Sequence, residues 1–138
     1  MSVEIADDYR PSDDEEFMNE KQLAYFRRLL ENWKADILDG AKQTITNLQD
    51  DSGSLPDIVD RASAESDKAL ELRTRDRQRK LISKIDAALR RIDEGEYGWC
   101  EVTGDPIGLR RLIARPVATM TVEAQEAHER REKISRDD

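Results

Sequence analysis

The sequence has one cysteine, Cys100, and one histidine, His128, among its 138 residues. A single cysteine excludes a disulfide bond within the chain, which is compatible with a reducing cytoplasm. A closed structural zinc site needs four ligands, usually cysteine and histidine, so these two residues cannot complete one.

Aromatic residues make up only 5% of the chain, whereas charged residues make up 39%. Such a chain is too polar for one compact core of this length, and it favours long exposed helices that bury a single stripe. No apolar run is long enough to cross a membrane. The N-terminal stretch MSVEIADDYRPSDDEEF lacks the basic and apolar regions of a signal peptide. We therefore expect a cytoplasmic protein that does not contact membranes.

The net charge of −8 argues against direct binding to DNA or RNA, which requires a basic surface. The charge is uneven, because residues 1–20 are acidic and basic residues gather between 73 and 91 and between 110 and 115. A basic run on a helix is often only a solvated face, so a binding surface and a solvated face both stay open at this point.

The first long helix is predicted to begin after Asn19, which can cap it together with Gln22 three residues later. Apolar residues then recur at alternating steps of three and four, which is the heptad pattern of a coiled coil. The stop signal is the Asp-Asp-Ser-Gly stretch at residues 50–53. The predicted seam consists of Leu23, Phe26, Leu30, Trp33 and Ile37.

A second helix is predicted from Asp57, a suitable N-cap, with Asp60 in the first turn where the helix dipole favours negative charge. Its apolar stripe is clearest at Leu81, Ile85 and Ile92, and the Gly-containing stretch 94–98 ends it. Two such helices joined by a short turn predict an antiparallel hairpin whose arms are each about 50 Å long.

The remaining residues predict a small module followed by a last helix over 122–135, capped by Thr121. The predicted fold class is therefore mainly α: a long antiparallel coiled-coil hairpin, a small degenerate zinc-finger-like globular module and a C-terminal helix. The predicted divisions are a flexible acidic segment at 1–17, the hairpin at 18–96 with its tip near 52–62, and the zinc-free module with the C-terminal helix at 97–138.

The stretch YGWCEVTGDPIGLRRLIARP, residues 97–116, has the Gly and Pro content of a metal-binding turn. The two-pair spacing of a zinc finger would place ligands at Cys100, Thr103, Thr121 and Ala124, but only the first is a good zinc ligand. We expect Cys100 to be a small buried side chain without a redox role. Apolar packing should replace the metal, from Trp99, Ile107, Leu109, Leu112, Ile113, Val117, Met120 and Val122.

Four stretches together resemble the DksA family of bacterial transcription factors: EEFMNEKQLAYFRRLLENW, DIVDRAS, LELRTRDRQRKLISKI and YGWCEVTGDPIGLRRLIARPVA. The resemblance extends over about residues 15 to 133, nearly the whole chain, in the same order. Typical members carry four zinc-binding cysteines, so this chain resembles a variant that has lost three. The resemblance therefore implies no bound zinc and no other cofactor.

The resemblance implies that the hairpin tip enters the secondary channel of RNA polymerase and approaches its active centre. The family's tip motif corresponds to Asp57, Asp60 and Ala62, with Ile58 where many members have proline. Without the resemblance, both aspartates would be sufficiently explained as helix caps.

Other site residues follow from the same resemblance. Arg77 corresponds to a polymerase-binding position, and Lys84, Arg115 and Gln125 to positions that bind the alarmone ppGpp at the polymerase interface. Gln125 replaces a lysine, and its neutral amide can hydrogen-bond phosphate but adds no charge.

The function that the resemblance implies is stringent-response control of transcription. The chain would bind polymerase as a monomer and destabilise open promoter complexes, repressing rRNA-type promoters and activating some biosynthetic promoters together with ppGpp. An exposed helical turn offers no enclosed metal site, so we expect no enzyme activity. Two alternatives stay open: a Gre-like elongation or transcript-cleavage factor, and a coiled-coil adaptor protein.

Overall fold

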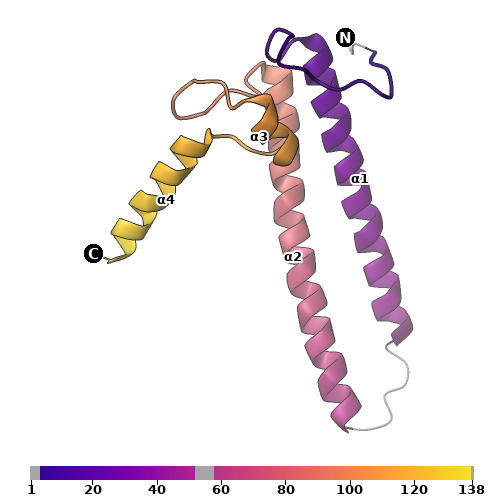
Figure 1. Cartoon of the computed structure of the whole chain (residues 1–138). Helices are drawn as coiled ribbons and strands as arrows, with labels where there is room; N and C mark the ends of the chain where they lie inside the picture. The colour runs from indigo at the N-terminus through magenta and orange to yellow at the C-terminus, as the bar shows by residue number, and fades with distance from the viewer. Residues whose placement is uncertain (1–3, 52–57, 138) are drawn as a thin grey trace. The chain divides into compact units, whose positions relative to one another are not determined.

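The structure is a computed structural model that describes residues 4–51 and 58–137. These ranges contain the helices α1 (Glu20–Asp51), α2 (Ile58–Glu94), α3 (Leu109–Ala114) and α4 (Val122–Asp137) (Figure 1). The described residues form no strand, only an isolated antiparallel bridge between Trp99 and Pro106. The predicted mainly-α fold class is therefore confirmed.

The chain divides into two compact units, and the division falls inside both long helices. Unit 1 comprises Met1–Leu30 and Ala87–Asp138, and unit 2 comprises Glu31–Asp86. The boundaries predicted from the sequence, at 17/18 and 96/97, fall at helix ends instead, and they stay predictions.

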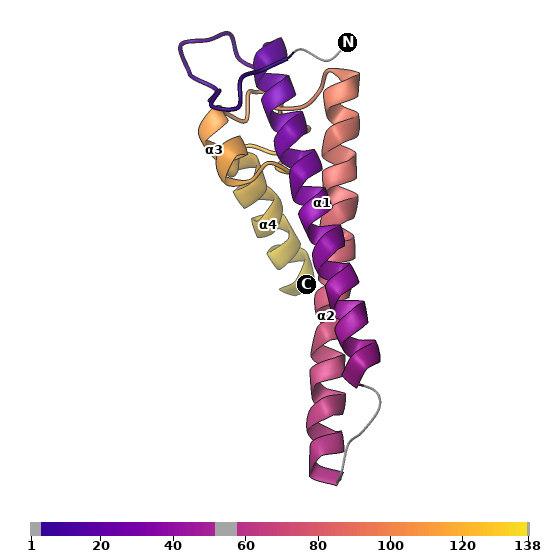
Figure 2. The same cartoon turned by 90° about the vertical axis from the view of Figure 1, so that its right-hand side faces the viewer.

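Unit 2 contains the parts of α1 and α2 that lie side by side and run in opposite directions in both views (Figures 1 and 2). Ile37 of α1 and Ile85 of α2 are buried. Lys34 Nζ lies 2.7 Å from Asp86 Oδ1, so an ion pair joins the two helices across the unit. The heptad pattern thus correctly predicts which faces of the helices meet.

Unit 1 contains the start of α1 and the end of α2, which also pack against each other. Phe26 and Leu30 are fully buried, and Ala88 and Ile92 are almost fully buried. The ion pair between Arg27 and Asp93 joins the two helices at their more exposed edge. The predicted seam is confirmed at Phe26, Leu30 and Ile37, whereas Leu23 and Trp33 are half-buried.

Of the two hydrogen bonds in the predicted capping box of α1, one is present and the other is replaced by a different bond. Asn19 Oδ1 accepts the backbone N–H of Gln22 at 2.8 Å, as in a capping box. Gln22 does not return to the N–H of Asn19, because its Oε1 accepts the N–H of Met18 at 2.7 Å. Gln22 is 0% exposed, and its Nε2 donates to the carbonyl of Ser12 at 3.2 Å.

Residues 4–18 make specific contacts with α1 within unit 1. The Tyr9 hydroxyl donates to the Glu15 carboxylate at 2.8 Å, and the Tyr9 ring meets the Tyr25 ring edge-on. Arg28 of α1 lies 3.9 Å from Asp7. The predicted flexibility of residues 1–17 concerns motion and stays a prediction, but the described part of this segment has defined partners.

The module after α2 has a core that only partly matches the prediction. Ile107, Leu109, Leu112 and Val117 are buried as expected. Trp99, Ile113 and Val122 were expected in the core and are 37%, 51% and 44% exposed, so that prediction is wrong for them.

The positions of Ile113 and Val122 in their helices explain why both are exposed. Ile113 follows the inward-facing Leu112 in the six-residue helix α3, so it faces another side, and Val122 begins α4. The central position belongs to the buried Tyr97, whose hydroxyl donates to the carbonyl of Pro116 at 2.7 Å. Burial raises the pKa of Tyr97 above its ordinary value, so this hydroxyl keeps its proton as donor.

Helix α4 begins as predicted, because Thr121 Oγ1 accepts the N–H of Ala124 at 3.2 Å. His128 is exposed, and its Nε2 lies 3.0 Å from the carboxylate of Glu132. Among the described helices, none is both long enough and apolar enough to span a bilayer.

Candidate functional site

The turn around Cys100, residues 97–108, is closed by main-chain hydrogen bonds. Cys100 N–H donates to the carbonyl of Asp105 at 2.8 Å, and Gly104 N–H donates to the carbonyl of Cys100 at 2.9 Å. Ile107 N–H donates to the carbonyl of Gly98 at 2.8 Å, which joins the two sides of the turn. We call these residues the finger turn.

Cys100 is 3% exposed, which confirms the predicted buried thiol. Burial raises the pKa of this thiol, but four donors oppose burial. They are the Thr103 hydroxyl and the backbone N–H groups of Thr103, Thr121 and Val102, and together they lower the pKa to about 6. Hydrogen bonds to the charged form favour the thiolate, so the buried sulfur has the surroundings of an anion.

The residues around Cys100 do not fit a zinc ion. The hydroxyl of Thr103 accepts the N–H of Asp105 at 3.3 Å, and the hydroxyl of Thr121 caps α4. Ala124 offers no ligand atom. Within the part of the chain that the structure describes, no three His, Cys, Asp or Glu side chains lie close enough to hold a metal.

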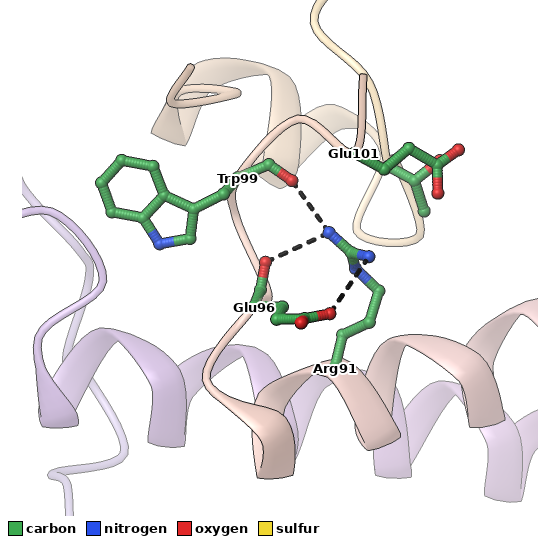
Figure 3. A network of polar contacts seen from close by, with 5 residues as sticks. Arg91, Glu96, Trp99 and Glu101 are labelled. Carbon is green, nitrogen blue, oxygen red and sulfur yellow. Dashed lines mark hydrogen bonds and ion pairs between the residues drawn. The ribbon is translucent and has the colours of Figure 1, made fainter. Parts of the chain in front are cut away.

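Arg91, near the end of α2, holds the start of the finger turn (Figure 3). Its Nη2 donates to the carbonyls of Glu96 and Trp99 at 3.1 and 2.9 Å, and its Nη1 lies 3.9 Å from the Glu96 carboxylate. In return, the N–H groups of Glu96 and Tyr97 donate to the carbonyl of Arg91. The sequence places Arg91 only in a basic cluster, because its two acceptors are backbone atoms that no motif identifies.

Unit 2 contains a groove of about 320 Å³ along one face of α2, where Arg77 and Lys84 lie. Its lining includes the apolar side chain of Leu81. None of its three cations makes an ion pair with another residue that the structure describes. The lining residues are Thr74, Arg77, Gln78, Lys80, Leu81 and Lys84.

The helical period explains this surface. Positions 73, 77, 80 and 84 carry Arg, Arg, Lys and Lys, and steps of four, three and four place them on one face of α2. Arg77 and Lys84 were selected by resemblance, whereas Lys80 was missed as a member of this face. The signal that could have found Lys80 is this same spacing within the basic run.

The three predicted alarmone-binding residues lie in different units. Lys84 is in unit 2, whereas Arg115 and Gln125 are in unit 1. Arg115 is exposed just after α3, and Gln125 Nε2 donates to Glu129 at 3.1 Å, so one of its amide donors is occupied. A common site for these residues therefore stays a prediction.

The predicted tip residues are described only in part. Asp57 lies outside the described residues. The backbone of Asp60 is in the first turn of α2, but its side chain is not among those described, and Ala62 is exposed in the same helix. Their role at a polymerase active centre stays a prediction.

Two family models match consecutive parts of the chain. The model described as "DnaK suppressor protein DksA, N-terminal domain" matches residues 22–92. The chain belongs to the DksA family. A second model, described as "Prokaryotic dksA/traR C4-type zinc finger", matches residues 95–130 and thus includes the finger turn and most of α4.

Curated relatives and a solved structure agree with this membership. The "RNA polymerase-binding transcription factor DksA" of Caulobacter vibrioides is 63% identical over 131 residues, covering 95% of this chain and 92% of the relative. The protein of the same name from Escherichia coli is 44% identical, covering 96% and 88%. The structure of the transcription factor DksA2 from Pseudomonas aeruginosa matches with a TM-score of 0.77 at 42% identity, covering 85% of this chain and 90% of that chain.

The finger turn departs from the family model in its cysteines. The matching model describes a C4-type finger, and this chain has one cysteine over the matched residues 95–130. The resemblance found in the sequence is confirmed, and so is the expectation that this DksA-type finger is degenerate in its cysteines.

Proposed function

We propose that the chain is a transcription factor that binds RNA polymerase. The observation that supports this most directly is the 63% identity, over 92% of its length, to a relative named for this function. The matched region includes both unit 1 and unit 2, because 95% of this chain is covered.

The groove on α2 supports a binding role. Arg77, Lys80 and Lys84 are cations without a described partner beside the apolar Leu81. A protein surface of this kind suits an acidic partner, because complementary charge speeds association and selects against wrong partners. We propose Arg77 as a polymerase-binding residue.

We propose the finer mechanism from the family resemblance. The hairpin tip, with Asp57, Asp60 and Ala62, would act in the secondary channel, lowering the lifetime of open promoter complexes. rRNA-type promoters would be repressed and some biosynthetic promoters activated. Lys84, Arg115 and Gln125 would contribute to ppGpp binding at the polymerase interface, and neutral Gln125 should make the response weaker than with a lysine.

We further propose that the chain works in the cytoplasm as a monomer, without zinc and without catalytic activity of its own. The degenerate set Cys100, Thr103, Thr121 and Ala124 supports the absence of zinc, because it supplies one good ligand. The acidic net charge of −8 supports a protein partner over direct contact with DNA.

The deciding experiment measures binding to purified cognate RNA polymerase and run-off transcription from an rRNA promoter, with and without ppGpp. Arg77→Ala should weaken polymerase binding about tenfold or more, as expected for a central cation at an interface. Arg79→Ala is the matched control, because Arg79 is exposed on the same helix but turned about 200° away from Arg77.

The tip is tested separately. Asp60→Asn should keep polymerase binding and abolish promoter regulation. A coiled-coil adaptor would keep all of its activity in this variant, and a cleavage-type factor would shorten nascent RNA in backtracked complexes. No binding of the unaltered chain to polymerase would refute the proposed function.

A further inference from the structure

The finger turn is closed although the chain lacks three of four zinc cysteines. In a four-cysteine finger, metal binding supplies a large part of the folding free energy. The turn is closed here by main-chain bonds: the Cys100 N–H donates to the carbonyl of Asp105 at 2.8 Å, and the Glu101 N–H donates to the carbonyl of Thr119 at 2.9 Å. These hydrogen bonds are few, and they replace a metal ion that would otherwise hold the turn. We therefore expect residues outside the finger turn to stabilise it.

Phe17 and Met18 contact the finger turn directly. The Phe17 ring meets the Trp99 ring edge-on, with centroids 5.3 Å apart and an interplanar angle of 88°. Met18 covers Gly98 so closely that a Cβ placed on Gly98 would lie 2.6 Å from Met18 Cγ and Sδ. Residues from the N-terminal segment therefore cover the residues that immediately precede Cys100.

These contacts depend on an unusual backbone conformation at Met18. Its φ is 56°, which is the left-handed region that non-glycine residues rarely adopt. The fully buried Gln22 holds it there, accepting the N–H of Met18 while donating to the carbonyl of Ser12. A conformation of this cost persists only where the surrounding structure enforces it.

A second route joins the segment to the turn through four aromatic rings. Tyr9 meets Tyr25, Tyr25 meets Phe26, and Phe26 meets Tyr97, with centroids 6.2, 5.2 and 5.5 Å apart. Tyr97 then donates to the carbonyl of Pro116, on the far side of α3 in the chain. The described contacts thus connect Tyr9 with Tyr97, which precedes α3, and through Tyr97 with Pro116, which follows α3.

We propose that residues 9–18, which we call the N-terminal clamp, do the structural work that zinc does in a four-cysteine finger. The clamp holds Gly98 and Trp99, and thereby keeps the main-chain hydrogen bonds of Cys100 with Asp105 and Gly104 closed. The inference goes beyond polymerase binding, and its tests measure the fold of the free chain, so its failure would leave the proposed function standing.

The first test uses Phe17→Ala, which removes the ring that contacts Trp99. Glu16→Ala is the matched control, because Glu16 is the exposed neighbour in the same segment. Phe17→Ala should lower the melting temperature by roughly 5–10 °C. It should also speed amide hydrogen exchange at Cys100 and Gly104 at least about tenfold, since both amides bond within the turn. Unchanged exchange at these two amides in Phe17→Ala would overturn the proposal.

The second test rebuilds a metal site with Thr103→Cys, Thr121→Cys and Ala124→Cys together. If the rebuilt chain takes up one zinc, Phe17→Ala should lower its melting temperature in both conditions. The decrease with zinc bound should be less than half of the decrease after chelation. An equal cost in both conditions would overturn the proposal, because the clamp and the metal would then be independent. If the rebuilt chain takes up no zinc, the exchange measurement alone decides.

Discussion

The Nη2 atom of Arg91 lies 2.9 Å from the carbonyl oxygen of Trp99, and this bond crosses from α2 to the finger turn (Figure 3). The same guanidinium also holds the carbonyl of Glu96. Arg91 is therefore the point at which a long helix fixes the turn that follows it. The finger turn is held by Arg91 from α2 and, we propose, by the N-terminal clamp.

Replacing Arg91 should destabilise unit 1. Arg91→Met keeps the length of the side chain but leaves two carbonyls without their donor, so the free energy of unfolding should fall by about 2 kcal/mol. Denaturation in urea, followed through tryptophan fluorescence, measures the change. Arg90→Met is the control, since Arg90 is exposed and adjacent. Equal stabilities of the two variants would show that the Arg91 bonds contribute nothing.

The thiol of Cys100 should make stability depend on pH. Its pKa in the folded chain is about 6, below the ordinary value of about 8.5 in an unfolded chain. A depressed pKa stabilises the fold fully above the unfolded value, and this stabilisation is lost as the pH falls through the folded value. Between those two values, each unit of pH should change the free energy of unfolding by up to about 1.4 kcal/mol.

Cys100→Ser isolates this effect, because a serine hydroxyl can accept the same hydrogen bonds but does not ionise in this range. Under reducing conditions, the free energy of unfolding of the unaltered chain minus that of Cys100→Ser should rise from pH 6 to about pH 8.5 and level off above it. A difference that is constant across this range would mean that the folded chain does not prefer the thiolate.

The hairpin was predictable from the sequence because its information is periodic. Phe26, Leu30 and Ile37 recur at heptad spacing in α1, as do Ile85 and Ile92 in α2, and each is buried in the structure. Family membership was predictable for a different reason, since the motif around Cys100 is specific even where its metal ligands are missing.

The finger turn and its support were not predictable in the same way. Contacts such as Phe17 with Trp99 join residues far apart in the chain, and no local period marks them. The role of Gln22 was partly foreseen as a cap, but its bonds to Met18 and Ser12 depend on a left-handed residue that propensity does not favour. Trp99 was expected in the core because it is hydrophobic, whereas it is 37% exposed and meets the Phe17 ring edge-on.

Acid should weaken the N-terminal clamp. The hydrogen bond from Tyr9 lowers the pKa of Glu15, with further help from Asn19, Ser12 and Lys21, while partial burial opposes the shift. A lowered carboxyl pKa stabilises the fold above the unfolded value of about 4.3, and this contribution is lost as the pH falls through the folded value.

Tyr9→Phe should remove most of this acid dependence, because the main cause of the shift is gone. The measurement is the pH titration of the Glu15 carboxyl carbon by NMR, together with melting temperatures from pH 3 to pH 6. The Glu15 midpoint should move upward in Tyr9→Phe. An unmoved midpoint would mean that the Tyr9 hydroxyl does not bond Glu15 in solution.

Gly98 offers the sharpest test of how closely the clamp lies on the finger turn. Gly98 and Gly104 both have positive φ, 92° and 76°, so alanine at either position carries backbone strain of about 1–2 kcal/mol. They differ in surroundings, because a Cβ at Gly104 would meet nothing within 4 Å, whereas one at Gly98 would strike Met18. Gly98→Ala should therefore cost more than Gly104→Ala by about 1 kcal/mol or more, as overpacking does. In the double variant Met18→Ala/Gly98→Ala, this excess should disappear, since the clashing atoms are gone. Equal costs at the two glycines would mean that Met18 does not rest on Gly98 and that the segment before α1 is free to move away from the turn.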